Sequence, residues 1–432
     1  MNTVHPSSAS GRPSGKNPFT SRSQRRLAIA AIAVAGLVLV GCAPAADDGG
    51  AEDQTVTVWH YFSDANQVKI LDDYKAMFEE ANPEMTVENV YIPYDQMVPN
   101  LLKSATSSDG PDVVVFNGGD ATTLAVGGAL APLDKQWAAY ADAGQYSDAL
   151  LRSLDGTLYA TSGYVNLLGL WYNQDVLDAV GVDPPTTLDE LNAALDEVVA
   201  AGYQGITLAG VPNGQSEWQA YPWMSAFGFD YADPQREPLI KAFRMAQEWV
   251  SSGALSAEAV TWDQTVPFQT FAAGNVAFAE NGDWQRGTAE STASFNYGVV
   301  PLPVGDKGGV YMGGEGLSIG AFADSPTLAW KYLEETYLSV EGQLIALKTV
   351  GSIPARADAA QADEVTSDPL IAAFAETIAT SGQAYPAAVV PAESASDLGL
   401  EVGTVWSAVL AGQVTPEDAA DQVLAIVAKL IK

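Results

Sequence analysis

Aromatic and short polar residues occur together where the sequence predicts that strands end. Trp59 and Tyr61 close a run of alternating polar and apolar residues, and Asp64 begins the next predicted helix. Asn117 and Asp120 follow the apolar run 112–116. Aromatic rings offer flat apolar faces, and the polar side chains exchange hydrogen bonds. Because such groups collect at the carboxyl ends of strands in open α/β sheets, we expect these residues to bind a ligand with apolar faces and hydroxyl edges.

The same residues also have ordinary structural interpretations. Trp59 would serve as a core residue of its strand, and Asp64 and Asp120 would cap helices. A second aromatic segment, 215–223, follows a turn rich in Gly, Pro and Asn and contains the candidates Trp218 and Trp223. Packing in the core is the alternative for both tryptophans. The sequence leaves these alternatives open.

Motifs for nucleotide binding and covalent catalysis are missing from the sequence. The run 312–316 is rich in glycine, but it lacks the Lys-Ser/Thr of a phosphate-binding loop, and no Gly-x-Ser-x-Gly motif occurs. Glycosidases use a pair of carboxylates, but a chain with 53 acidic residues contains such pairs by chance, so their presence does not indicate glycoside hydrolysis. The only histidines, His5 and His60, are far apart, so a zinc site is not expected. We expect no catalytic residue, no cofactor and no metal.

The chain is strongly acidic, with a net charge of −33. Residues 1–41 contain five basic residues and no acidic one, so the remainder has 15 basic against 53 acidic residues, a net −38. Such a surface repels nucleic acid and anionic lipid headgroups. We therefore expect no nucleic-acid partner, and the charge itself favours solubility.

The first 42 residues have the features of an export signal. Arg25 and Arg26 precede an apolar run from Leu27 to Val40, which is short for a membrane-spanning helix. The sequence Leu-Val-Gly-Cys then ends at Cys42, the only cysteine, and resembles the bacterial lipobox, in which lipid such as palmitate is attached to the cysteine. We expect a signal peptide over 1–41 and a flexible acidic tether over 42–54. A plain cleaved signal is the alternative, and the export route, Sec or twin-arginine, stays open.

The chain from Thr55 onward has the pattern of an α/β protein. Strands are expected over 55–59, 86–92 and 112–116, with helices over 68–78 and 96–106, an order that implies a doubly wound sheet. A second unit contains strand-like stretches over 158–172 and a helix that begins with a capping box, Thr187 to Glu190. The last helix is expected to begin at Thr415-Pro416. Because no low-complexity linker follows residue 54, we expect the two units to share crossing strands that form a hinge.

With these elements placed, the chain resembles the extracellular sugar-binding proteins of ABC importers, the family that includes maltose-binding protein. Four segments carry the resemblance: 56–61, 110–116, 156–187 and 271–284. The resemblance implies a type II periplasmic-binding-protein fold, with two lobes and a ligand cleft between them. Crossings would fall near Thr161, Pro301 to Pro303, and Ile353-Pro354. The N-terminal lobe would comprise 55–161 and 303–353, and the C-terminal lobe 162–302 and 354–432.

The resemblance also implies further cleft residues. Tyr164 and Asn166 follow the first crossing, and Trp284 stands where the family often places an aromatic platform. The family often presents glycine amides near Gly314, beside which Glu315 would accept a hydroxyl group, and an arginine near Arg356 commonly reaches the sugar. Tyr385 is a weaker candidate. Structural positions are the alternative for Tyr164, Asn166, Trp284, Glu315 and Arg356.

The expected function is therefore binding without chemistry. A monomer tethered to the extracellular face of the bacterial membrane through Cys42 would capture a mono- or oligosaccharide and deliver it to a permease. Two alternatives stay open: the same fold binding a polyamine or other small solute through an acidic, aromatic cleft, and an extracellular glycoside-acting enzyme.

Overall fold

The computed structural model describes residues 54–387 and 389–431. The predicted signal peptide, Cys42 and nearly all of the predicted tether lie outside the described residues.

The first of two sheets has six strands in the order β2-β1-β3-β11-β5-β4. Their bounds are β1 (Thr55–His60), β2 (Thr86–Tyr91), β3 (Val113–Asn117), β4 (Leu151–Leu154), β5 (Thr157–Thr161) and β11 (Glu315–Ile319). Strand β1 pairs in parallel with β2 and β3, and β11 runs antiparallel to β3 with Glu315 opposite Asn117. The expected strands over 55–59, 86–92 and 112–116 are confirmed within a residue or two.

The second sheet is built around the ten-residue strand β6 (Tyr164–Asn173). It has the order β13-β10-β6-β8-β7, and β9 and β12 also pair with β6. The other bounds are β7 (Gln204–Thr207), β8 (Val276–Gly282), β9 (Tyr297–Val300), β10 (Val310–Gly313), β12 (Ile353–Pro354) and β13 (Gly382–Ala384). We call each sheet with the helices packed on it a lobe, the first and the second. The predicted α/β class with two lobes is confirmed.

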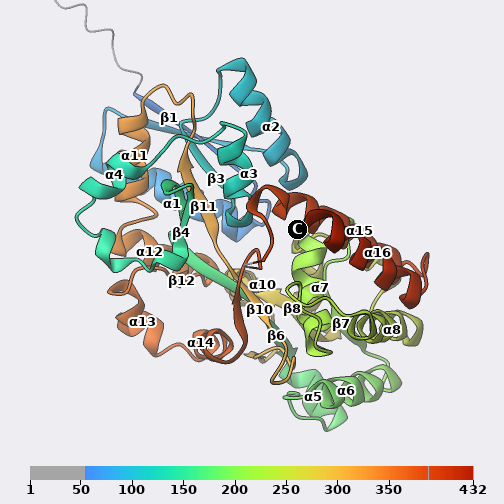
Figure 1. Cartoon of the computed structure of the whole chain (residues 1–432). Coiled ribbons are helices and arrows are strands. Elements are labelled where there is room, and N and C mark those ends of the chain that lie inside the picture. The colour runs from blue at the N-terminus through green and yellow to red at the C-terminus, as the bar shows by residue number, and fades with distance from the viewer. Residues whose placement is uncertain (1–53, 388, 432) are drawn as a thin grey trace, which may run out of the picture. The chain divides into compact units, whose positions relative to one another are not determined.

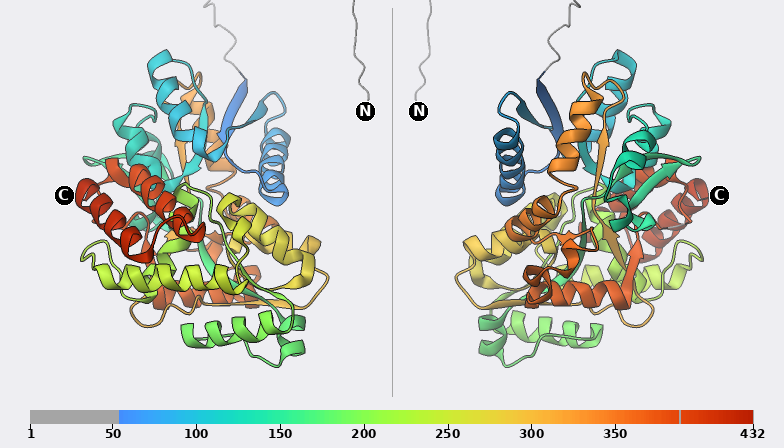
Figure 2. Two further views of the ribbon diagram at one scale, coloured as in Figure 1. Left: turned by 90° about the vertical axis from the view of Figure 1, so that its right-hand side faces the viewer. Right: turned by 90° about the vertical axis from the view of Figure 1, so that its left-hand side faces the viewer.

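Helices cover both sheets (Figures 1 and 2). The first lobe has α1 (Ala65–Ala81), α2 (Tyr94–Ser107), α3 (Ala121–Val126), α4 (Asp134–Ala139), α11 (Pro326–Glu335) and α12 (Val340–Val350). The second has α5 (Gln174–Val180), α6 (Leu188–Ala200), α7 (Gly214–Ala226), α8 (Arg236–Ser252), α9 (Thr265–Thr270), α10 (Arg286–Thr292), α13 (Asp363–Thr366), α14 (Pro369–Ser381), α15 (Ala395–Leu410) and α16 (Pro416–Leu430). Helices α15 and α16 pack on α7 and α8.

Local sequence explains where several helices begin. Both halves of the capping box form at α6, where Thr187 accepts a hydrogen bond from the Glu190 amide and the Glu190 carboxylate accepts from the Thr187 amide. Thr415 caps α16, with Pro416 in its first turn, as the sequence predicts. The region 325–349 is two helices, because Ser339 caps a new helix, α12, at the Gly342 amide.

The chain passes between the sheets at three places. It goes from β5 to β6 at 162–163, from β10 to β11 at Gly314, and it returns through β12, which pairs with the start of β6. The second crossing therefore lies at Gly314 and not at Pro301 to Pro303, because β9 and β10 both belong to the second sheet. The crossings are close-packed: a Cβ atom on Gly314 would lie 2.5 Å from the Tyr164 carbonyl oxygen.

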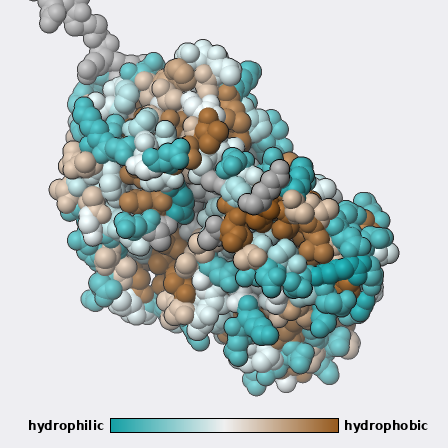
Figure 3. All heavy atoms as spheres, viewed as in Figure 1, coloured by the Kyte–Doolittle hydropathy of each residue, from teal (hydrophilic) through white to brown (hydrophobic). Residues whose placement is uncertain are grey.

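Hydrophobic side chains from both lobes form the main core, and a smaller cluster lies between α2 and the first sheet. Hydrophilic residues cover much of the face in Figure 3, and hydrophobic residues gather near α15. Among the described residues, none of the helices combines the length and the apolar character that crossing a bilayer requires.

Candidate functional site

A cavity of about 340 Å³ lies where the two lobes meet, beside the Gly314 crossing. The first lobe lines it with the ends of β1, β2 and β3, and the second lobe with α7, the start of α9 and the turn after β8. Seven residues predicted as ligand contacts line it: Tyr61, Asn117, Asn166, Trp218, Trp284, Gly314 and Glu315. The weaker candidate Tyr385 lines it too.

Glu315 lies at the floor of the cavity, as the first residue of β11. The Tyr61 hydroxyl donates a hydrogen bond to Oε2 of Glu315, and Asn166 Nδ2 donates to Oε1 at 3.3 Å. Burial raises the pKa of Glu315 to about 7, and the hydrogen bond from Tyr61 opposes this rise. The carboxyl group therefore links β1, β6 and β11 and changes its charge near neutral pH.

Tyr94 and Asn117 form a second polar group on the first-lobe side. Asn117 Nδ2 donates to the Tyr94 hydroxyl at 3.2 Å, while Asn117 Oδ1 accepts from the Gly119 amide at 2.9 Å, which fixes the orientation of the amide. Tyr94 packs edge-to-face on Tyr61, with ring centroids 5.3 Å apart. Sequence reasoning missed Tyr94, although it directly follows Pro93, where the second strand was expected to end.

Trp284 presents an aromatic ring from the second lobe. It belongs to a short 3₁₀ turn (Asp283–Gln285) after β8, and its ring lies so close to Gly282 that a Cβ atom there would overlap it. Asp283 holds this turn against the crossing strand β6, since its Oδ1 accepts a hydrogen bond from the Leu167 amide at 2.8 Å. Burial raises the pKa of Asp283 well above its usual value.

Trp218 provides a further aromatic surface from α7. Its ring packs against Tyr385 and Tyr311, with centroids 4.7 and 5.6 Å away. The close approach of Trp218 and Asn166 leaves no room for a side chain at Gly313. Beneath them, Glu217 accepts a hydrogen bond from the Tyr311 hydroxyl at 3.3 Å, so a buried polar contact supports the aromatic wall.

Glutamine side chains add polar groups that sequence reasoning missed. Gln215 Oε1 accepts from the Gln264 amide at 3.0 Å, and Gln285 Nε2 donates to the Gln264 carbonyl at 3.4 Å. All three line the cavity. Only Gln215 belongs to the aromatic segment 215–223 that was identified from the sequence. Gln264 belongs to a loop before α9, and nothing in its sequence predicts the end of a strand there.

Charged groups of both signs reach the cavity lining. Asp95, Asp263 and Glu315 are acidic, and Arg152 from β4 is basic. Burial lowers the pKa of Arg152. Among the described residues, no group of three or more His, Cys, Asp or Glu side chains is placed to hold a metal ion.

Three candidates from the sequence do not line the cavity because they have local structural roles. Trp59 lies within β1 and packs against the smaller core cluster under α2. Asp64 caps α1 through the Asn66 amide at 2.9 Å. Trp223 is fully buried, and its Nε1 donates to Glu280 at 2.6 Å.

Tyr164 and Asp120 also lie outside the cavity lining. Tyr164 is buried in the main core, opposite Pro354 of β12, so it belongs to the packed crossings. Asp120 accepts a hydrogen bond from the Ser396 hydroxyl of α15 and thus contacts the other lobe instead of the cavity.

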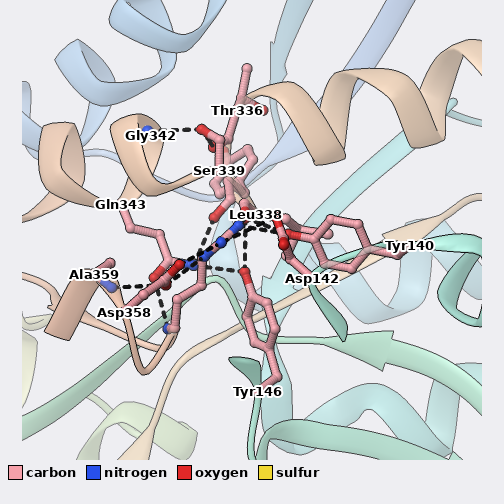
Figure 4. Close-up of polar contacts among 12 residues, drawn as sticks. Tyr140, Asp142, Tyr146, Thr336, Leu338, Ser339, Gly342, Gln343, Asp358 and Ala359 are labelled. Carbon is pink, nitrogen blue, oxygen red and sulfur yellow. Dashed lines mark hydrogen bonds and ion pairs between the residues drawn. The ribbon is translucent and has the colours of Figure 1, made fainter. Parts of the chain in front are cut away.

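Arg356, the remaining candidate, is buried in a polar network of the first lobe. Its Nη1 donates to the Tyr140 hydroxyl at 3.0 Å and to the Leu338 carbonyl at 2.9 Å, and its Nε and Nη2 form a forked pair with Asp358. Figure 4 shows how Tyr140 and Tyr146 also converge on Leu338. Every one of these donors is already used, so Arg356 anchors the chain just after β12.

The arrangement of two lobes, three crossings and an interlobe cavity can be compared with known proteins. A family model described as bacterial extracellular solute-binding protein matches residues 73–373. The chain belongs to this family. The resemblance inferred from the sequence is therefore confirmed at the level of the family and the fold.

Individual relatives are distant in sequence but match over most of their length. The melibiose/raffinose/stachyose-binding protein MelE of Bacillus subtilis is 23% identical over 312 residues, which cover 68% of this chain and 72% of MelE. The GacH receptor of Streptomyces glaucescens has been solved unliganded and with acarbose. It has a TM-score of 0.78 at 23% sequence identity, and the match covers 87% of this chain and 98% of the GacH chain. Maltose-bound MalE3 of T. maritima also has a TM-score of 0.78, at 19% identity over 87% and 99% of the two chains.

Proposed function

We propose that this solute-binding protein captures a sugar in the interlobe cavity and delivers it to the permease of an ABC importer. The observation that carries the proposal is the lining itself: Trp218 and Trp284 of one lobe and Tyr61 and Tyr94 of the other surround a set of amide and carboxyl groups. Aromatic faces bind the C–H faces of sugars, while amides and carboxylates bind hydroxyl groups. The ligands named for the relatives, which are oligosaccharides and acarbose, support the same class of ligand.

The size of the cavity favours a short sugar. Ligand pockets range over roughly 300–1,000 Å³, and a volume of about 340 Å³ is near the lower limit. The proposed contacts are Tyr61, Tyr94, Asn117, Asn166, Trp218, Trp284, Gly314 and Glu315. The protein acts without catalysis, by differential contact with its closed form.

A thermal-shift screen tests this function. The purified protein is mixed with melibiose, raffinose, stachyose, maltose, maltotriose and single hexoses, and a sugar at 100 times its dissociation constant should add about 2.7 kcal/mol of stability. Spermidine belongs in the same screen, because three carboxylates line the cavity. A thermal shift with spermidine that disappears as the salt concentration rises, with no shift for any sugar, would indicate that the ligand is a polycation and not a sugar.

A chromogenic-glycoside assay tests the enzymatic alternative. We expect no turnover. Hydrolysis that one carboxylate substitution abolishes would contradict the proposal of binding alone.

The location of the protein is tested separately. We propose that Cys42 carries a lipid anchor that holds the protein at the extracellular face of the membrane. In a bacterial host the unaltered chain should partition into detergent after export, and Cys42→Ser should move it to the aqueous fraction. Equal partitioning of the two proteins would contradict the lipid anchor and would not bear on the proposed sugar binding.

A further inference from the structure

The contact between Asp120 and Ser396 joins the two lobes beside the cavity. Asp120 ends the short turn (Gly118–Asp120) that follows β3 in the first lobe, and Ser396 lies in the first turn of α15 in the second. The Ser396 hydroxyl donates to Asp120 Oδ1 and lies 3.4 Å from Thr123 Oγ1. In the left view of Figure 2 the red C-terminal helices lie against the teal part of the first lobe, and α15 contacts the turn 118–120.

This contact is independent of the three crossings. The crossings at 162–163, Gly314 and β12 are continuous chain, so a rotation between the lobes bends them without separating them. Asp120 and Ser396 belong to different lobes, and their hydrogen bond, together with the packing of α15 on the turn 118–120, joins those lobes away from the crossings. A rotation that opens the cavity would separate the two residues, so the bond belongs to the arrangement in which the lobes approach each other.

Among the described residues, the Ser396 hydroxyl is the side-chain group that donates to this carboxylate. The ring of Tyr385, from the second lobe, lies so close to neighbouring Gly119 that a Cβ atom there would overlap it. Burial raises the pKa of Asp120 to about 6, and the hydrogen bond from Ser396 opposes the rise. Leaving a poorly solvated acceptor without its donor costs more free energy than removing both partners together. Separation of the lobes would return water to the carboxylate.

We propose that Asp120 and Ser396 are positioning residues that form an interlobe latch, which stabilises the closed form without touching the ligand. The latch acts on the equilibrium between the lobe arrangements, so it does not depend on which solute binds. Loss of the Ser396 hydroxyl leaves a half-buried carboxylate without its donor and shifts the equilibrium toward separation. Loss of both groups costs less than loss of the hydroxyl alone.

The test uses distances between spin labels in the protein without ligand. Labels at Lys103→Cys on α2 and Glu248→Cys on α8, both exposed positions, report one lobe each, and Cys42→Ser in the full chain leaves no other thiol. We expect Ser396→Ala to raise the ratio of separated to closed molecules about three- to tenfold. Asp120→Ala combined with Ser396→Ala should reverse part of this change, and Ser396→Thr, which keeps the hydroxyl, should restore the original distribution.

Ser104→Ala is the matched control. Ser104 is buried in α2, and its hydroxyl donates to the Leu101 carbonyl within the first lobe. The same chemical change there should leave the distribution unaltered. A distribution for Ser396→Ala equal to that of the unaltered protein, or an equal shift for Ser104→Ala, would overturn the latch. Because no sugar is present, these outcomes are separate from failure of the proposed function.

Discussion

Glu315 is expected to make ligand binding depend on pH. Both of its carboxyl oxygens accept hydrogen bonds, from Tyr61 and Asn166, and burial raises its pKa to about 7. A sugar hydroxyl that donates to Glu315 binds the ionised form better, because a charged acceptor makes the stronger hydrogen bond. A carboxyl with a raised pKa is mostly protonated at pH 6 and mostly ionised at pH 8. Affinity should therefore increase as pH rises.

The size of the effect follows from the titration. With a pKa of about 7, roughly one molecule in eleven is ionised at pH 6 and about ten in eleven at pH 8. The apparent dissociation constant should thus be up to about tenfold weaker at pH 6, the limit reached when the protonated form does not bind, since affinity scales with the competent fraction. Glu315→Gln cannot ionise in this range, so it should bind several-fold more weakly at pH 8 and show no such step.

Isothermal titration calorimetry at pH 6, 7 and 8, with the sugar found in the screen, measures this step. Asp120→Asn is the control, because the pKa of Asp120 is raised to about 6 and its titration could produce a smaller step at lower pH. We expect that control to keep the step near pH 7. A step of the same size in Glu315→Gln, or tighter binding at pH 6, would refute the role given to Glu315.

Three further predictions concern affinity and stability. Trp284→Ala should weaken sugar binding at least tenfold and leave the circular dichroism spectrum unchanged; an unchanged dissociation constant would remove Trp284 from the site. Burial raises the pKa of Glu217 to about 7, so the native state binds an extra proton between about pH 4.5 and 7, and stability should fall as pH rises through that window. Glu217→Gln should reduce this loss of stability by at most about 3 kcal/mol, as measured by urea titrations. An equally steep decrease in the variant would mean that other groups cause the pH dependence. Arg356→Lys loses the forked pair with Asp358 and should lower the free energy of unfolding by roughly 3 kcal/mol without changing sugar affinity. A changed sugar affinity with unchanged stability would show that Arg356 contributes to the binding site.

The sequence predicted elements well where the signal is local. The capping box at Thr187 and the proline after Thr415 each place a helix boundary within a residue of the structure. The alternation over 55–59 identifies β1, because a strand has a repeat of two residues. These signals need no knowledge of the rest of the chain.

Which aromatic residue near the end of β1 reaches the cavity was not predictable in this way. Trp59 and Tyr61 were equal candidates, yet Trp59 packs under α2 while Tyr61, one residue past the strand, reaches Glu315. Residues two apart in a strand point to the same face, so alternation does not distinguish them, and the difference depends on where β1 ends. Arg356 illustrates the same limit, since only the fold brings Tyr140 and the Leu338 carbonyl to its guanidinium group.

The residues that were missed come from loops whose position depends on tertiary contacts. Gln264 lies near the cavity because the Gln215 side chain accepts a hydrogen bond from its amide and Gln285 donates to its carbonyl. Neither partner is near it in the sequence. The second crossing was misplaced for a related reason: Pro301 and Pro303 mark a turn within the second lobe, and the passage itself is marked only by Gly314.

Gly314 and Glu315 are neighbours in the chain, so the residue at the floor of the cavity is also the first residue beyond a crossing. Anyone who redesigns this protein as a sensor for another solute would find that recognition and motion are encoded in one segment. A substitution at Glu315 chosen for a new ligand would also remove the acceptor for Asn166, a hydrogen bond that joins the two lobes. Reporter groups attached to α2 and α8 would then need recalibration for every such variant, whereas changes at Trp284 would leave their baseline signal in place.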